Sequence, residues 1–226
     1  MNAVSETTPN NFICPRLHVI TDTQCQNTHT HLELAQAALA GGAKLIQYRD
    51  KSEPNSRLRL NVAKLIAEEC RKADAQLIIN DRTDIASLCP GAGLHIGPTD
   101  LEMKDARMLL GQEPVIGATV NTQGHALALV EERPSYIGLG PFRASSNKEA
   151  AKIGLGLDGM RGLLQETQTC LGSHIPCIAI GGIQVDDVAS LLKIGFHGVA
   201  VIGAIAQSSS PEAATRSFLQ AIEHAL

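Results

Sequence analysis

The chain has 226 residues, of which 44% are hydrophobic and 19% are charged, which suits one globular domain with a sizeable core. Lys and Arg number 19 against 23 Asp and Glu, giving a net charge of −4, so the basic excess typical of nucleic-acid-binding proteins is missing. No apolar run approaches the ~20 residues of a membrane span. The polar N-terminus lacks the apolar region of a secretory signal.

We therefore expect a cytoplasmic protein in which residues 1–12 form a flexible tail and residues 13–226 form one catalytic domain. No two of the six cysteines have the C-x-x-C spacing of zinc or redox sites. We expect them to be free thiols, mostly buried, in a reducing compartment.

Short apolar runs alternate with longer amphipathic segments. Eight runs are predicted to be buried parallel strands, because a strand covered on both faces is apolar throughout: 17–20, 45–48, 77–79, 93–96, 115–118, 136–139, 177–180 and 199–202. The intervening segments are predicted to be helices: 31–40, 56–72, 84–88, 101–110, 123–131, 157–169, 185–193 and 211–225.

Strands that alternate with helices indicate parallel β/α units, which form either a doubly wound sheet or a closed barrel. No Gly-x-Gly-x-x-Gly follows the first strand, which argues against a dinucleotide-binding fold. Polar residues follow many different strands, as at the active-site face of a barrel. We therefore predict a single (β/α)8 TIM barrel.

The second predicted strand ends in a polar run: Gln47, Tyr48, Arg49, Asp50 and Lys51. Alternate strand residues face the same side, so Gln47, Arg49 and Lys51 share one face. This trio suits a multiply charged anion, because Arg can bind phosphate oxygens in a bidentate fork and Lys adds a point charge. A salt-bridged surface patch is the alternative, and the position after an apolar strand favours anion binding.

Asn80 and Asp81 end the third strand, and Asp100 follows the fourth. A helix N-cap role explains one of the first pair, and it explains Asp100 equally well. Two carboxylates near a cationic phosphate site indicate a metal, since Mg²⁺ is commonly held by one or two carboxylates plus substrate phosphates. His95, within the fourth strand, is first interpreted as a core residue with its hydrogen bonds satisfied.

Glycines mark the ends of the later strands. Gly140 precedes a small, polar and basic loop around residues 143–148, which could close over bound phosphate or form a disordered surface loop. Gly181 and Gly182 follow the seventh strand and Gly203 follows the eighth. Backbone amides at these two positions commonly bind phosphate in barrels.

Four motifs, in this order and spacing, resemble those of the thiamine-phosphate synthases: Gln-x-Arg-x-Lys at 47–51, Ile-Ile-Asn-Asp-Arg at 78–82, Gly-Pro at 140–141 followed by Lys148, and Ala-Ile-Gly-Gly-Ile at 179–183. The resemblance runs from about Leu17 to about Ile205. It implies condensation of 4-amino-2-methyl-5-(diphosphooxymethyl)pyrimidine with a thiazole phosphate. The products would be thiamine phosphate and pyrophosphate, formed by a dissociative substitution assisted by Mg²⁺.

The resemblance also implies roles for individual residues. It assigns catalysis to Arg49, Lys51 and Lys148, and Mg²⁺ binding to Asp81 and Asp100. It assigns the pyrimidine diphosphate to Gln47, Tyr48, Arg49, Asp50, Lys51, Asn80, His95, Thr119 and Lys148. It assigns the thiazole phosphate to Ser145, Ser146, Asn147, Gly181, Val201 and Ile202. The partners are then small molecules, with no nucleic acid or membrane, and a homodimer is the family-level expectation.

Several positions depart from the commonest family pattern: Pro98 replaces Gln, 119–121 replace Ser-x-His and end in Asn121, 145–147 replace Thr-x-Thr and end in Asn147, and Gly203 replaces Ser. Two alternatives stay open, namely a thiazole tautomerase-like isomerase and a non-catalytic barrel that binds a phosphate ligand. The complete set of cations and carboxylates favours the transferase.

Overall fold

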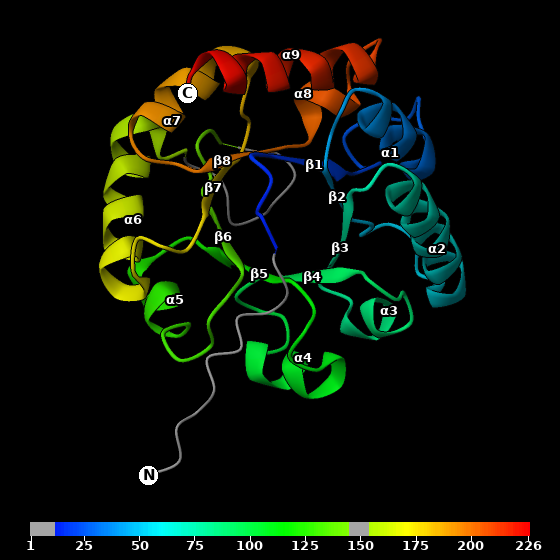
Figure 1. The fold of residues 1–226 in the computed structure, drawn as a ribbon, viewed down its shortest axis with the longest axis horizontal. Coiled ribbons are helices and arrows are strands. Elements are labelled where there is room, and N and C mark those ends of the chain that lie inside the picture. Colours follow the sequence, from blue (N-terminus) through cyan, green and yellow to red (C-terminus); the bar gives the residue numbers. More distant parts are fainter. Residues whose placement is uncertain (1–11, 145–153) are drawn as a thin grey trace.

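Eight parallel strands close into a barrel in chain order, with β8 pairing back to β1. The structure, a computed structural model, describes residues 12–144 and 154–226. Helices form an outer ring around the barrel (Figure 1), so the predicted (β/α)8 architecture is confirmed. The strands are β1 (Leu17–Thr21), β2 (Leu45–Tyr48), β3 (Gln76–Asn80), β4 (Gly93–Ile96), β5 (Ile116–Val120), β6 (Tyr136–Leu139), β7 (Cys177–Ile180) and β8 (Gly198–Val201).

The helices follow the strands in turn. They are α1 (His31–Ala40), α2 (Ser56–Lys72), α3 (Thr83–Ser87), α4 (Met103–Leu110), α5 (Gln123–Leu127), α6 (Gly156–Leu171), α7 (Val188–Lys193), α8 (Gly203–Ala206) and α9 (Pro211–His224), with the short 3-10 helix η1 (Val185–Asp187) before α7. Thr30 and Glu33 form a capping box at the start of α1, which satisfies backbone N–H groups there.

Three details differ from the predicted helices. The fifth helix was expected to reach residue 131, but α5 ends at Leu127. Beyond Leu127, backbone hydrogen bonds span three residues instead of the four of an α-helix. Leu129 N donates to Ala126 O and Glu132 N donates to Leu129 O, both at 3.0 Å. The segment 185–193 is split into η1 and α7, and the four-residue α8 was not predicted.

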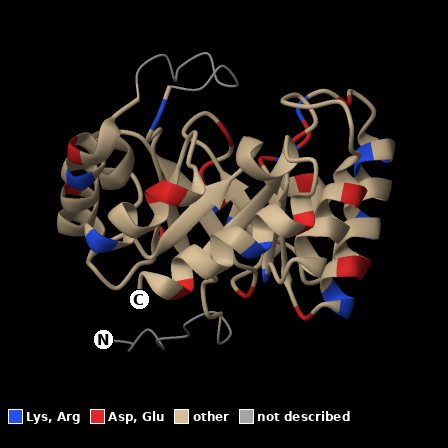
Figure 2. Cartoon of the chain, turned by 90° about the horizontal axis from the view of Figure 1, so that it is seen from above, with Lys and Arg blue, Asp and Glu red and all other residues tan. Residues whose placement is uncertain are grey.

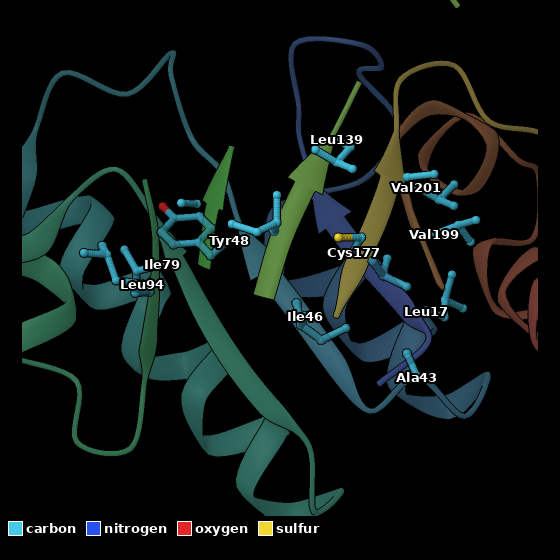
Figure 3. Close-up of a cluster of buried hydrophobic side chains, with 14 of the residues drawn as sticks. Leu17, Ala43, Ile46, Tyr48, Ile79, Leu94, Leu139, Cys177, Val199 and Val201 are labelled. Atoms are coloured by element: carbon cyan, nitrogen blue, oxygen red, sulfur yellow. The ribbon is translucent and has the colours of Figure 1, made fainter. Parts of the chain in front are cut away.

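The main core lies between the barrel and the helices. Outward-facing strand residues such as Leu17, Ile46 and Ile79 are buried there against the helices, as Figure 3 shows for part of this layer. Burial on both sides of every strand explains why the strands are apolar throughout.

A second, smaller core fills the barrel itself. It contains Ile20, Leu45, Ile78, Ile178 and the aromatic ring of Tyr136. Because strand residues alternate, the inward set continues toward the carboxyl ends of the strands as polar side chains, among them Gln47 and His95. The barrel therefore changes from apolar to polar toward one rim.

Charges of both signs are spread over the helices and loops (Figure 2). All six cysteines are free, as predicted, and four are buried. Among residues 12–144 and 154–226, no helix is both long and apolar enough to cross a membrane. The predicted tail lies almost wholly outside the described residues and stays a prediction.

Candidate active site at the carboxyl ends of the strands

The predicted anion-binding residues of β2 lie at the rim. Gln47 is in the strand, and Arg49 follows it on the same face. Arg49 is only 8% exposed, and its guanidinium forms an ion pair with the carboxylate of Asp22. Asp22, directly after β1, is fully buried, and it also accepts a hydrogen bond from Gln24 N at 2.9 Å. A buried cation with a fixed partner is held in one orientation.

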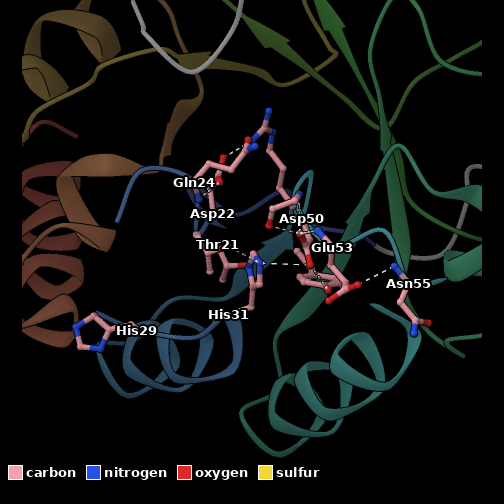
Figure 4. A network of polar contacts seen from close by, with 12 residues as sticks. Thr21, Asp22, Gln24, His29, His31, Asp50, Glu53 and Asn55 are labelled. Atoms are coloured by element: carbon pink, nitrogen blue, oxygen red, sulfur yellow. Dashed lines mark hydrogen bonds and ion pairs between the residues drawn. The ribbon is translucent and has the colours of Figure 1, made fainter. Parts of the chain in front are cut away.

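Asp22 is not among the residues predicted from the sequence. Its one signal is its position, as an acidic residue directly after the first strand, where barrel active sites gather side chains. Figure 4 shows Asp22 and Gln24 at the turn after β1.

Lys51 and the two predicted metal ligands are brought together. The ammonium of Lys51 forms an ion pair with Asp81, which adopts a left-handed backbone with φ of 61°. The carboxyl groups of Asp81 and Asp100 are in hydrogen-bond contact. Burial, together with this contact, raises the pKa of Asp100, while the Gly97 N–H bonded at 2.7 Å opposes the rise.

This arrangement fits a divalent cation. Two carboxylates that face each other repel, and a positive charge, here the ammonium of Lys51, already lies against one of them. No group of three or more His, Cys, Asp or Glu side chains able to hold a metal occurs in the described parts of the chain. Two carboxylates are nevertheless enough for Mg²⁺ when phosphate and water supply the other ligands.

Asp100 is not the N-cap residue of the helix that follows it. Helix α4 begins at Met103 with Glu102 at its N-cap position, so the carboxylate of Asp100 is left for the loop after β4. Helix α3 has Arg82 at its N-cap position, so neither Asn80 nor Asp81 caps it.

His95 lies inside the barrel, below the rim. Its Nδ1 is 3.0 Å from the hydroxyl of Tyr136, and its Nε2 is 2.8 Å from the hydroxyl of Thr119. The expectation of a buried histidine with hydrogen-bond partners is therefore confirmed. Asn80 pairs in register with His95, and Thr119 pairs with Gly138, so these residues occupy adjacent strands.

Tyr48 and Asp50 lie on the other side of β2, toward α1. The Tyr48 hydroxyl donates to Asp50 Oδ2 at 3.2 Å, and the Tyr48 ring meets the ring of His31 edge-on. Asp50 Oδ1 accepts hydrogen bonds from the backbone N–H groups of Ser52 and Glu53, each at 3.0 Å. This network, seen in Figure 4, holds the loop that carries Lys51.

The loops after β6 and β7 are joined by backbone hydrogen bonds. Phe142 N donates to Ile180 O and Arg143 N to Gly181 O, both at 2.9 Å. Gly181 has φ of 108°, and a Cβ there would lie 2.7 Å from Cβ of Pro141, so only glycine fits. These two loops form one continuous wall of the site.

A cavity of about 600 Å³ opens beside this wall. Arg49 lies on its border, and Gly181, Ile202 and Gly203 line it from the loops after β7 and β8. Val201 is buried at 2% exposure in the layer between barrel and helices, so its side chain does not face the cavity. Ser145, Ser146, Asn147 and Lys148 lie outside the described residues.

The family model for thiamine monophosphate synthase matches residues 17–205. The chain belongs to the thiamine monophosphate synthase family. It is 39% identical to the thiamine-phosphate synthase of Salinibacter ruber over 93% of this chain and 90% of that protein. The thiamine-phosphate synthase of Chloroflexus aurantiacus is 33% identical over 89% of each chain.

A solved structure supports the same family. The thiamine phosphate pyrophosphorylase from Pyrococcus furiosus superposes with a TM-score of 0.79 at 30% identity, covering 93% of this chain and 96% of that one. Family membership places this chain among transferases and confirms the resemblance that the four motifs indicated.

Proposed function

We propose that this protein is a thiamine-phosphate synthase, which joins a pyrimidine methyl diphosphate to a thiazole phosphate and releases pyrophosphate. The observation that carries the proposal is the grouping of Arg49, Lys51, Asp81 and Asp100 at one rim of the barrel. The adjoining cavity of about 600 Å³ falls in the size range of small-molecule sites.

The proposed reaction requires stabilisation of the leaving group, which is pyrophosphate. The bond between the pyrimidine methylene carbon and the diphosphate oxygen breaks, and its electron pair leaves with the pyrophosphate. The thiazole nitrogen then shares its lone pair with that carbon, which forms the new C–N bond. Arg49 and Lys51, each held by an aspartate at the rim, would balance the charge that develops on the pyrophosphate. By resemblance, Lys148 adds a third positive charge.

Asp81 and Asp100 would hold Mg²⁺, which when bound supplies further positive charge to the diphosphate. Gln47, Asn80, His95 and Thr119 line the barrel interior below and would orient the pyrimidine. The glycine-rich wall would accept the thiazole phosphate through backbone N–H groups, with Gly181 and Ile202 at the border of the cavity. Ser145, Ser146 and Asn147 are assigned to this phosphate by resemblance alone.

The test is a reaction with both purified substrates, followed by pyrophosphate release and by formation of thiamine phosphate. Product should require both substrates and Mg²⁺. Absence of product in the complete mixture would overturn the proposed function. Conversion of a thiazole phosphate into an isomer without the pyrimidine would instead indicate an isomerase of the same fold.

Two variants test the proposed roles. Arg49→Ala and Lys148→Ala should each lower kcat by ~10²-fold or more, the usual scale for removing one group that stabilises developing charge. Arg71→Ala is the matched control, because Arg71 is an exposed cation on α2 paired with Glu68. Turnover near that of the wild type in the Arg49 and Lys148 variants would overturn those assignments.

A further inference from the structure

A connected set of polar side chains lies inside the barrel beneath the rim. Tyr136 of β6 is at its centre, with 1% of its surface exposed. From the sequence, a tyrosine at the start of an apolar strand indicates core packing and no further role.

The ring of Tyr136 is held tightly in place. Its neighbour in register is Gly117 of β5, where any Cβ would overlap the ring. The ring of His18 packs edge-on at 4.8 Å between centroids, and the ring of His95 stacks at 5.5 Å. Contacts on these sides leave the phenol little freedom, so its hydroxyl has a fixed position.

That hydroxyl faces His95. Its oxygen lies 3.0 Å from Nδ1 of the imidazole. Burial raises the pKa of Tyr136 well above its usual value, so the phenol keeps its proton. A buried O–H needs an acceptor, and among the described residues the hydrogen bond of this phenol is to Nδ1 of His95. The phenol proton therefore points at Nδ1.

The direction of this bond fixes the next one. If Nδ1 of a neutral imidazole accepts, the ring proton is on Nε2. Nε2 lies 2.8 Å from the hydroxyl oxygen of Thr119, so it donates to that oxygen. The Thr119 hydroxyl therefore accepts the hydrogen bond from His95, and its own proton stays available for another acceptor. Thr119 is only partly buried near the carboxyl end of β5, and the family resemblance assigns it to the pyrimidine diphosphate.

We propose that Tyr136 is a positioning residue: its hydroxyl fixes His95 as the Nε2–H tautomer and so keeps the Thr119 hydroxyl as a donor to the bound diphosphate. The consequence for catalysis rests on the proposed function, whereas the tautomer of His95 does not. A donor to the departing oxygen gains strength as negative charge develops, so its loss lowers kcat more than it raises KM.

The tautomer is tested first, on the wild-type protein without substrates. Two-bond ¹H–¹⁵N correlation spectra of histidine-labelled protein distinguish protonated from unprotonated ring nitrogens, and His95→Asn identifies the signals of His95. We expect Nδ1 to be unprotonated and Nε2 to be protonated. A protonated Nδ1, alone or together with a protonated Nε2, would overturn the proposal even if the protein makes thiamine phosphate.

The second step is Tyr136→Phe, which keeps the ring and removes the hydroxyl. The Nε2–H pattern should give way to a mixture of tautomers, and kcat should fall about tenfold with KM for the pyrimidine diphosphate changing less than about twofold. Thr167→Val is the control, since Thr167 on α6 is equally buried and its hydroxyl bonds Leu163 O at 2.7 Å. It should change neither the spectrum nor kcat.

The positioning role of Tyr136 and the proposed function can fail separately. An unchanged tautomer in Tyr136→Phe, or a kcat loss no larger than that of Thr167→Val, would overturn the positioning role. If the complete mixture yields no thiamine phosphate even with the wild-type protein, the proposed function fails, and the spectra still decide whether Tyr136 sets the tautomer.

Discussion

The carboxylate of Asp22 holds the guanidinium of Arg49 in an ion pair that is almost completely withdrawn from water. A buried ion pair is expensive to form, because both charges lose their hydration, and it is retained only where the geometry and additional hydrogen bonds compensate. Here Gln24 N supplies one such bond at 2.9 Å. Asp22 therefore presents Arg49 to the cavity in a fixed orientation.

The first prediction concerns this pair. Asp22→Asn keeps the shape of the side chain but leaves the Arg49 charge buried without its counter-ion, so the free energy of unfolding should fall by about 3 kcal/mol. It should also lower kcat at least about tenfold, because the guanidinium is no longer held in place. Urea unfolding and steady-state kinetics measure the two effects.

The control is Glu68→Gln, which removes the partner of the exposed Arg71 on α2. An exposed ion pair contributes about 0–1 kcal/mol, so both stability and turnover should stay close to those of the wild type. An Asp22→Asn protein that matched this control would contradict the role given to Asp22.

The strands could be predicted from the sequence because both of their faces are buried. Each begins within one residue of its predicted start, since an apolar run bounded by polar residues has few alternatives. The helices were harder to delimit. The end of α5 depends on hydrogen bonds that tighten after Leu127, and α8 has only four residues, too few to give a periodic pattern.

The charged residues of the site could be predicted from the sequence. The residues whose roles depend on packing against distant partners could not. Arg49, Lys51 and the two aspartates stand out as charged residues after strands, and the structure groups them. Asp22 and Tyr136 act through partners that are distant in the chain, Arg49 and His95. No local pattern reports such pairings, which appear only when the barrel closes.

The second prediction concerns the repulsion between Asp81 and Asp100. The raised pKa of Asp100 means that its charged form is less favourable in the folded protein than in the unfolded chain. The contribution of this group to stability therefore falls as the pH rises past its usual value and stays unfavourable at pH 8. Without Mg²⁺, Asp100→Asn should raise Tm at pH 8.

The same variant should respond less to the metal. Adding Mg²⁺ should raise Tm of the wild type, because the ion binds only the folded protein, and should raise it much less in Asp100→Asn. Thermal melts with and without Mg²⁺ measure both effects. A fall in Tm of the metal-free variant, or an equal response to Mg²⁺, would argue against a metal site at these carboxylates.

The third prediction concerns the space that Gly117 leaves for Tyr136. Gly117→Ala places a methyl group inside the Tyr136 ring, and overpacking of this kind costs about 1–3 kcal/mol. Gly162→Ala is the matched control, because no heavy atom lies within 4 Å of the added methyl group on α6. There the change should stabilise the protein by about 0.5–1 kcal/mol. Equal effects at the two sites in urea unfolding would show that Gly117 is not constrained by the ring.

The fourth prediction is a pH dependence of stability that arises from His18. This side chain is buried inside the barrel beside Tyr136, and burial lowers its pKa from 6.5 to about 3. Between these two values the unfolded chain binds a proton at His18 and the folded protein does not. Stability should therefore fall as the pH falls from 6.5 toward 3, with a slope of up to about 1.4 kcal/mol per pH unit from this one group.

Urea unfolding between pH 4 and pH 7 measures that slope. His18→Gln removes the titrating group, so the slope should decrease by up to one proton even if the variant is less stable overall. His224→Gln is the control, because His224 is exposed at the end of α9 and its surroundings change little on unfolding. If the His18 variant kept the wild-type slope, the acid sensitivity would have to come from other groups, and the neutral imidazole inside the barrel would not be a determinant of stability.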